Sequence, residues 1–572
     1  MGDRPLSFHI PPPIVTGTTI ADSLKSFSPM TTLPRPQAEK LNLTTKIAFG
    51  AGDIGPALTA NVLVFFLLYF FTQVAGLPPG LAGSILMIGK IADAVNDPIV
   101  GMMSDRTRTK WGRRIPWMLW GTLPFVIVFF GQWLVPHFSD VDQINDWFLF
   151  GYYVLMGVLF NLAYTAVNLP YAALTPELTQ DYNERTSLNS FRFSFSIGSS
   201  IFSLIVARIV FQAYPDNPAK QYWILGLVCS IFALLTLLWC TLRLQEKGRA
   251  AILNNQQRIT FGYILAALSG LTVLGIGALQ WLQVGFVWTF VAIALAILLG
   301  VSAFTFIQSP TEVHLLVAHP SQDDGEAPVP FKEQLKIAFS NKPFLYVIGI
   351  YLASWLAIQL TASILPYFVI SWMGLPDAMF PNTALAVQGT ALILLFVASF
   401  LSRKFGKKKV YFVGVSLWIF AQVGLFFLQP GQVGLMFFFA VMAGCGVAVS
   451  YLIPWSMVPD VIELDELNTG KRREGVFYGF MVLLQKMGLA ISLFLVGQAL
   501  SWAGFIESVA GETPPVQPDS ALFAIRVAIA PLPTIALIIG LVLAYFYPIT
   551  KEYHEEIRLK LAERKNQEIT DL

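Results

Sequence analysis

The sequence predicts an all-α polytopic membrane protein, and three observations lead to that prediction. Hydrophobic residues make up 55% of the 572 residues and charged residues only 13%, whereas soluble domains carry about 25% charged residues. The mean hydropathy is +0.62. Fourteen apolar runs are long enough to cross a bilayer, which takes about 20 helical residues. The formal net charge of +2 gives no sign of a nucleic-acid partner.

The apolar runs fall into two blocks of six with a hairpin between them. The first block lies at approximately 50–75, 81–104, 115–135, 146–174, 190–213 and 221–243. The hairpin lies at about 261–282 and 284–307, and the second block at approximately 343–373, 382–402, 410–428, 432–457, 474–503 and 522–547. Near the span ends stand aromatic residues of the kind that anchor at a membrane interface: Trp133, Trp147, Tyr152 and Trp502.

Basic residues predict the orientation of the spans. Loops 105–114 and 403–409 hold five Lys and Arg residues each. The alternate loops are nearly free of them, with none in 136–145, 374–381, 429–431 and 504–521 and only Lys220 in 214–220. Because basic loops stay inside, we expect both termini to be cytoplasmic and the protein to lie in the plasma (inner) membrane.

These spans divide the chain into five parts. Residues 1–42 are rich in Pro, Ser and Thr and are expected to be a disordered cytoplasmic tail. The two six-helix bundles are expected at 43–245 and 336–550, joined by a central connection, 246–335, that contains the hairpin. Residues 551–572 are expected to form a cytoplasmic tail. We expect the hairpin to face lipid, since neither of its apolar runs holds an ionisable residue.

Span two carries ionisable residues where a membrane helix is normally apolar. Lys90, Asp93 and Asp97 follow each other at steps of three and four, so they share one helical face, with Asn96 beside them. A charge at the bilayer centre costs about 2.5–3.5 kcal/mol on insertion scales, so these residues need a function or a partner. Their oxygens suit a monovalent cation, Na+ or H+. In the simplest alternative, Lys90 only neutralises Asp93.

Other charged residues also lie within the apolar runs. Lys486 lies in the middle of the run at 474–503 and has no acidic neighbour at helical spacing, so its partner must come from another helix. The carboxylates of span two are the predicted partners. Asp53 lies near the start of span one, and Arg192 opens span five.

Several motifs carry a family resemblance. The segment GMMSDRTRTKWGRR resembles the loop signature of the major facilitator superfamily, whose two six-helix halves match the layout above. DAVNDPIVG resembles the glycoside–pentoside–hexuronide:cation symporters within that superfamily. The resemblance continues through 164–192, through PWSMVPDVIELDE at 454–466 and through GVFYGFMVLLQKMG at 475–488. It covers roughly 400 residues in both blocks, while the hairpin lies outside it.

The resemblance implies roles for particular residues. A coupling cation would be bound by Asp93, Asn96, Asp97 and Thr165, with Lys486 and Lys90 as charge partners. A small-molecule substrate would be bound by Asn168, Tyr164, Arg192 and Asp53. A cytoplasmic gating loop would consist of Gly101, Asp105, Arg106, Gly112, Arg113 and Arg114. Apart from the coupling ion no cofactor is implied, and we expect a monomer.

At the positions that would hold the cargo, this sequence departs from the sugar-transporting members of the family. Sugar-transporting members hold hydroxyl groups with aspartates on the first and fourth helices, and the aligned positions here are Ala57 and Asn168, with Ala172 in place of an aromatic residue. A sugar or glycoside remains the first expectation. PWSMVPDVI also resembles sodium-coupled lysophospholipid transporters, which is the alternative. We expect no enzymatic activity, because all five histidines lie in predicted tails or loops.

Overall fold

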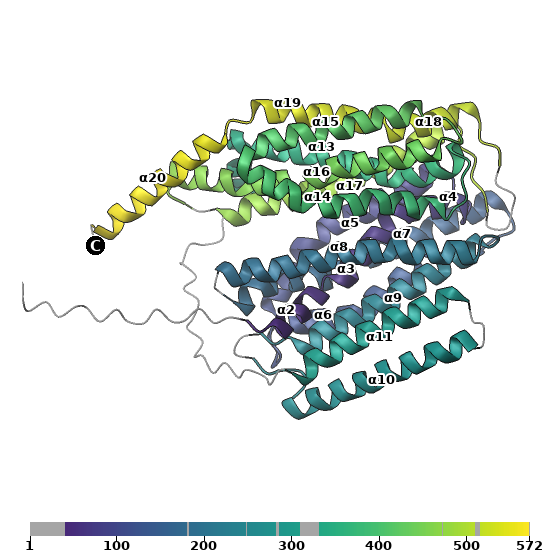
Figure 1. The fold of residues 1–572 in the computed structure, drawn as a ribbon, viewed down its shortest axis with the longest axis horizontal. Helices are drawn as coiled ribbons and strands as arrows, with labels where there is room; N and C mark the ends of the chain where they lie inside the picture. The colour runs from purple at the N-terminus through teal and green to yellow at the C-terminus, as the bar shows by residue number, and fades with distance from the viewer. Residues whose placement is uncertain are drawn as a thin grey trace, which may run out of the picture. The chain divides into compact units, whose positions relative to one another are not determined.

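The computed structural model describes residues 41–179, 182–246, 249–281, 285–308, 331–471, 473–509 and 515–570. The predicted disordered tail falls almost wholly outside the described residues. The described part is almost entirely helical, as predicted, and Figure 1 shows its helices running roughly side by side.

The N-terminal half has helices at the positions of all six predicted spans, and the first of these is divided into several pieces. Its helices are α2 (Leu43–Ala51), α3 (Ile54–Val62), η1 (Leu63–Leu67), α4 (Leu68–Gln73), α5 (Pro79–Arg106), α6 (Ile115–Gly131), α7 (Asp142–Leu178), α8 (Tyr182–Ala213) and α9 (Pro218–Arg243). Capping residues set several starts: Asn42 accepts from the backbone N–H of Thr44, and Asn217 from that of Lys220.

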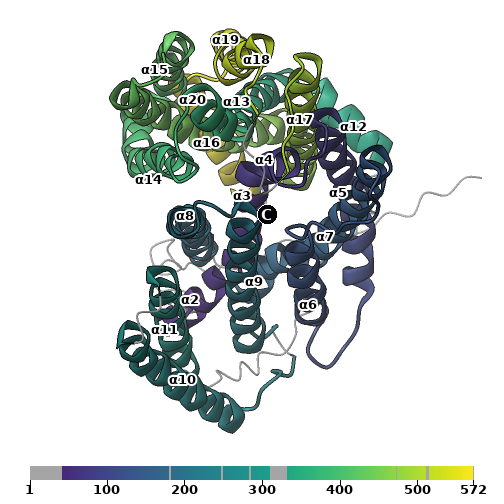
Figure 2. The ribbon, with the colours of Figure 1, turned by 90° about the vertical axis from the view of Figure 1, so that its right-hand side faces the viewer.

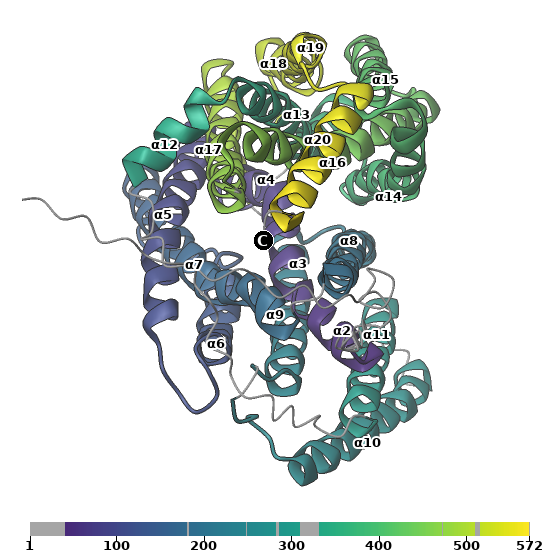
Figure 3. The ribbon, with the colours of Figure 1, turned by 90° about the vertical axis from the view of Figure 1, so that its left-hand side faces the viewer.

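The C-terminal half contains the other six spans and two amphipathic or polar helices. Its helices are α12 (Phe331–Ser340), α13 (Lys342–Tyr367), η2 (Phe368–Trp372), α14 (Met379–Phe405), α15 (Lys407–Phe427), α16 (Val433–Thr469), α17 (Glu474–Trp502), α18 (Asp519–Ile529), α19 (Pro531–Phe546) and α20 (Lys551–Thr570). Figures 2 and 3 show α13–α19 gathered on one side and α6–α9 on the other, with α4 and α5 next to helices of the C-terminal half. The predicted tail after residue 550 is helical as α20 up to Thr570.

The predicted hairpin is formed by α10 (Asn255–Trp281) and α11 (Phe286–Ile307), which pack against each other. α11 also packs on α8 and α9, while α10 lies outermost (Figure 1). The indole N–H of Trp239 donates to the Thr305 hydroxyl at 2.8 Å, and Arg243 Nε donates to the Thr305 carbonyl at 2.9 Å. These bonds fasten the hairpin to the N-terminal half.

Twelve described helical segments are long and apolar enough to cross a membrane, so the protein is a multi-pass membrane protein. The twelve include α10 and α11. They do not include α5, which carries the charged residues of span two, or α6, which has only 17 residues.

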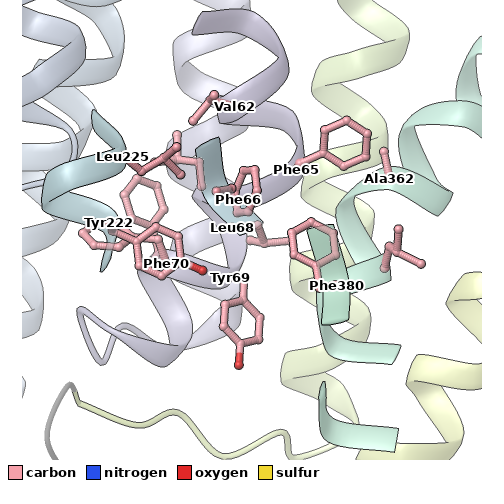
Figure 4. Packing of buried hydrophobic residues seen from close by; sticks show 14 of the residues in the cluster. Val62, Phe65, Phe66, Leu68, Tyr69, Phe70, Tyr222, Leu225, Ala362 and Phe380 are labelled. Carbon is pink, nitrogen blue, oxygen red and sulfur yellow. The ribbon is translucent and has the colours of Figure 1, made fainter. Parts of the chain in front are cut away.

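The two ends of the helices differ in charge and in the contacts between the halves. We call the end with loops 107–114 and 403–409 the basic end, and the end with loops 74–78 and 373–378 the opposite end. At the opposite end an aromatic cluster joins the halves: Phe66 of η1 packs against Phe380 of α14 at 4.9 Å between ring centroids, and against Tyr222 of α9 at 6.2 Å (Figure 4).

A repeated segment closes the opposite end. YFFTQVAGLP at 69–78 and YFVISWMGLP at 367–376 occupy the same place in the first helices of the two halves. Both end in a glycine with positive φ, 73° at Gly76 and 65° at Gly374, which only glycine adopts readily. The hydroxyls of Thr72 and Tyr367 share a hydrogen bond of 2.7 Å between the halves, and Ser508 N donates to the Thr72 carbonyl at 3.0 Å.

Trp133 corrects one prediction from the sequence. Its side chain is only 2% exposed and stacks on Tyr222, with ring centroids 5.8 Å apart and planes 9° apart. It is a core residue of the N-terminal half and not an interface anchor. Trp147 and Trp502 are exposed, which is compatible with their predicted place at the interface.

The crossing of α5 and α17 depends on two glycines, and this leads to a testable prediction. A Cβ at Gly497 would lie 2.6 Å from the Pro79 carbonyl oxygen and 2.7 Å from the Cα of Gly83. Because both obstacles are backbone, Gly497→Ala must push the helices apart, at a cost of about 1–3 kcal/mol. We expect a lower thermal unfolding midpoint and slower uptake. Gly479→Ala, on the same helix with open space around it, is the control, and equal behaviour of the two variants would contradict the close crossing.

Candidate cation site and gating loop

Three helices bring the predicted cation residues together. α5 packs against α7 on one side and against α17 on the other. The three- and four-residue spacing of Lys90, Asp93 and Asp97 places all three on the face of α5 that meets these neighbours. Asp93 is only 2% exposed.

Lys486 bridges both carboxylates from the other half of the molecule. Its Nζ lies 2.5 Å from Asp97 Oδ2 and 3.0 Å from Asp93 Oδ1. Thr165 Oγ1 lies 3.0 Å from Asp93 Oδ1 and 3.0 Å from Asp97 Oδ1. A hydroxyl has one proton, so Thr165 donates to one carboxylate at a time and keeps lone pairs for a cation. The predicted meeting of Lys486 with span two therefore agrees with the geometry.

Lys90 completes the charge balance of the cluster. Its Nζ lies 3.9 Å from Asp93 Oδ2 and donates to Asn161 Oδ1 at 3.1 Å. The Asn161 amide in turn donates to the Gly157 carbonyl at 2.7 Å. Two lysines and two carboxylates make the cluster neutral without any added ion.

The structure differs from the predicted set of cation-binding residues at two positions. Asn161 was missed, although it precedes Thr165 by one helical turn on α7 and that spacing was visible in the sequence. Asn96 is half-buried, and among the hydrogen bonds and ion pairs of the described residues it takes part in none with the cluster. As the residue next to Asp97 it projects about 100° around the helix from that side chain.

A second ion pair lies inside the N-terminal half. Asp53 stands in the turn between α2 and α3, and its Oδ1 lies 3.2 Å from Arg192 Nε of α8. The Arg192 guanidinium also lies 5.3 Å from the ring centroid of Tyr171, a cation–π contact. The pair thus joins the break in the first span to the fifth.

The other two predicted substrate residues lie on α7. Tyr164 packs against Phe125 and Phe160, with ring centroids 6.1 and 5.9 Å apart. Asn168 Oδ1 is buried and has no hydrogen-bond partner among the described residues. A buried acceptor without a partner carries a desolvation penalty of about 1–3 kcal/mol, which a hydroxyl or N–H of a bound solute would remove.

The predicted gating loop consists of the last residues of α5 and the segment that joins α5 to α6. Arg114 forms an ion pair with Asp105 and donates from Nη1 to the Ser104 hydroxyl at 2.8 Å. Gly112 has φ of +111°, while Arg106 and Arg113 have exposed side chains. Gly101 is half-buried, and a Cβ there would touch Leu169 at 3.4 Å. The sequence did not identify Glu246, whose carboxylate binds this loop.

Comparison with known proteins identifies the family. The family model described as MFS/sugar transport protein matches residues 48–259 and 245–551. A Synechocystis protein named as an uncharacterized symporter is 56% identical over 92% of this chain and 98% of its own length. The sodium-dependent lysophosphatidylcholine symporter 1 of Mus musculus is 27% identical over 90% of this chain and 87% of its own, and that of Xenopus tropicalis is 26% identical over 92% and 91%.

Solved structures agree with the fold. The nucleoside transporter NupG is similar with a TM-score of 0.51 and 12% identity, over 89% of this chain and 100% of that one. The xylose transporter XylE of E. coli has a TM-score of 0.51 and 11% identity, over 90% and 98%. The resemblance to the major facilitator superfamily that the motifs predicted is confirmed. The chain therefore belongs to the MFS/sugar transport protein family.

Proposed function

We propose that this protein is a cation-coupled symporter that moves a small organic solute by alternating access. The observation that carries the proposal is Lys486 of one half bridging Asp93 and Asp97 of the other, beside the Thr165 hydroxyl. Ionisable side chains inside membrane helices mark ion and substrate pathways. We propose Na+ as the coupling ion, because carboxylate and hydroxyl oxygens are ligands of hard cations; H+ is the alternative.

The charge of the cluster suggests how coupling works. Since the cluster is already neutral, a cation bound there would leave an excess positive charge unless a lysine moves away. Lys486 is the lysine that reaches across from the other half, so a cation that replaces it also loosens a tie between the halves. Ion binding would in this way be linked to the rearrangement of α5 against α17.

The contacts between the two halves at the opposite end are those expected for one state of an alternating-access cycle, the state in which that end is closed. The Thr72–Tyr367 hydrogen bond and the Gly83–Gly497 contact hold the halves together there. By the positive-inside rule we propose that the basic end is cytoplasmic, with both termini on that side of a plasma (inner) membrane. We also propose that α5 and α6 cross the membrane, which with the twelve apolar spans gives fourteen crossings.

A sugar or glycoside is the first candidate cargo. The matching family model is described as sugar transport. Asn168 offers a buried acceptor without a partner, and the Asp53–Arg192 pair and Tyr164 lie on neighbouring helices of the same half. These four residues are the proposed substrate contacts.

A lysophospholipid is the second candidate, and a cavity favours it. The cavity, about 50 Å³ in volume, lies in the C-terminal half and reaches Phe65 of the first span. Its wall is mainly apolar and includes Ile358, Leu365, Phe368 and Val447. Such a wall suits an alkyl chain better than a sugar, and the cavity would have to widen to hold one, because a dry cavity of about 150 Å³ takes only a benzene ring. Relatives with 26–27% identity are named lysophosphatidylcholine symporters.

Uptake into proteoliposomes tests both the coupling and the cargo. A panel of sugars, glycosides and lysophosphatidylcholine is offered under an inward Na+ gradient and, separately, under an inward proton gradient. We expect one cargo class to accumulate only when Na+ is present. Accumulation that depends on the proton gradient alone would show that the coupling ion is H+ and not Na+. Uptake that depends on neither gradient would refute coupled transport.

A further inference from the structure

The carboxylate of Glu246 binds the backbone of the gating loop. It accepts hydrogen bonds from the N–H of Arg113 at 2.8 Å, of Arg114 at 2.6 Å and of Ile115 at 2.9 Å. Glu246 follows the end of α9 by three residues and is only 4% exposed. A carboxylate at the N-terminus of a helix, here α6, is favoured both by the free N–H groups and by the helix dipole.

A second contact and a glycine complete the attachment. Ala250 N donates to the Lys110 carbonyl at 3.0 Å, so the segment after α9 binds the loop at two places. Gly112 has φ of +111°, and any Cβ there would collide with the Glu246 carboxylate. The glycine of the loop signature is therefore needed both for its conformation and for the space that Glu246 occupies.

The attachment determines where the ion-pair partner Arg114 lies. Its backbone N–H is bound by Glu246, and its side chain reaches back to Asp105 and Ser104 at the end of α5. Trp117 Nε1 donates to the Thr107 hydroxyl at 2.7 Å from the first turn of α6. Glu246 thus holds the loop at the place where α5, α6 and α9 meet.

The C-terminal half repeats this arrangement with different chemistry. RTKWGRR at 108–114 corresponds to SRKFGKK at 402–408, and Gly406 has φ of +90°. Lys408 Nζ donates to the carbonyls of Tyr545 at 2.5 Å and Tyr547 at 3.3 Å, at the end of α19. In each half the glycine loop is fastened to the end of the last helix of that half.

We propose that Glu246 is a positioning residue of the gate: it fixes the loop to α9 so that Asp105 and Arg114 move with the N-terminal half as one unit when the basic end closes. The effect of Glu246 on closure of the gate rests on the proposed alternating-access function. The hydrogen bonds between Glu246 and the loop do not depend on which cargo is transported. Loss of the attachment weakens the closed state of the basic end and leaves the cation cluster intact.

Amide hydrogen exchange tests the attachment without a substrate. In Glu246→Gln one of the two acceptor oxygens becomes an NH2 group, so at least one of the three bonds is lost. We expect exchange at residues 113–115 to rise roughly fivefold to thirtyfold, with peptides of α5 and α17 unchanged. Glu246→Asp keeps two acceptor oxygens and should restore part of the protection. Glu556→Gln, which removes an exposed ion pair on α20, is the control. Exchange at the wild-type rate in Glu246→Gln would overturn the attachment.

Distances between the halves test the positioning role. Spin labels at Arg108 and Lys404, exposed residues at the basic end of each half, are introduced in a Cys445→Ser background. We expect Glu246→Gln to shift the distance distribution toward longer separations and to lower the maximal uptake rate several-fold with KM unchanged. Gly112→Ala should change the distance distribution and the maximal uptake rate in the same way. Because both residues belong to the same attachment, combining Gly112→Ala with Glu246→Ala should change these two quantities little further.

The outcomes separate this inference from the proposed function. Gly431→Ala carries the same backbone strain, with φ of +87° and open space, and should leave the distances unchanged. Faster amide exchange with an unchanged distance distribution would show that Glu246 stabilises the loop without positioning the gate, which overturns the proposal. If the wild-type protein transports none of the solutes tested, the distances still decide the role of Glu246.

Discussion

Replacement of Lys486 by glutamine should make the protein less stable without Na+ and make it bind Na+ more tightly. The substitution leaves two carboxylates facing only Lys90, so the cluster carries a net negative charge. Breaking a buried ion pair costs about 3–5 kcal/mol, and we expect about 3 kcal/mol because Asp97 is 26% exposed. The thermal unfolding midpoint measures this loss.

Sodium should reverse the loss in Lys486→Gln. In this variant Na+ no longer competes with the ammonium group of Lys486, so it should bind at least about tenfold more tightly than in the wild type. At a Na+ concentration 100-fold above its dissociation constant the stability gain is about 2.7 kcal/mol. Uptake should nevertheless be lost, because the tie that a cation has to displace is gone.

The control for this experiment is an exposed lysine. Lys404→Gln, at the basic end, should change neither the unfolding midpoint nor its dependence on Na+. If Lys486→Gln bound Na+ more weakly than the wild type, Lys486 would not compete with the cation. If a lower pH and not Na+ restored its stability, the coupling ion would be H+.

The central cluster was largely predictable from the sequence, and the reason is physical. Membrane helices exclude charge, so each ionisable residue within a span is conspicuous. Helical periodicity placed Lys90, Asp93 and Asp97 on one face, and Lys486 had no acidic neighbour on its own helix. A buried cation requires a partner, which left the acids of span two as the candidates.

Features that depend on packing between distant segments were not predictable. Trp133 stands near the end of a span, where aromatic residues are common at the interface, yet it stacks on Tyr222 in the core. Glu246 lies in a polar connection where an acid is ordinary, and only the folded chain brings it to the start of α6. Local sequence gives residue type and periodicity but not which loop a side chain will meet.

The boundaries of the first span show a similar limit. A single run at about 50–75 was expected, but the structure begins at Leu43 and breaks at Gly52–Asp53, with a π-helical turn at Leu63–Leu67. Hydropathy reports an apolar segment and not its hydrogen-bond register, so such breaks are invisible to it. The break matters because it places Asp53 beside Arg192.

Replacement of either acid should have the opposite effect on Na+ binding to that of Lys486→Gln. In Asp93→Asn or Asp97→Asn the two lysines face one carboxylate, so the cluster is positive before any cation arrives. One unit charge at about 4 Å contributes roughly 4 kcal/mol at an effective dielectric constant of about 20, which corresponds to about a thousandfold weaker Na+ binding.

Equilibrium binding of radioactive sodium and Na+-stimulated uptake measure this result for both variants. We expect both to lose stimulation by Na+ while remaining folded, because an amide replaces a carboxylate of the same size and keeps a hydrogen bond to Thr165. Asp216→Asn, an exposed acid in a loop at the opposite end, should behave as the wild type does. Wild-type Na+ affinity in both cluster variants would remove Asp93 and Asp97 from the coupling site, because a neutral amide cannot compensate the charge of a cation between two lysines.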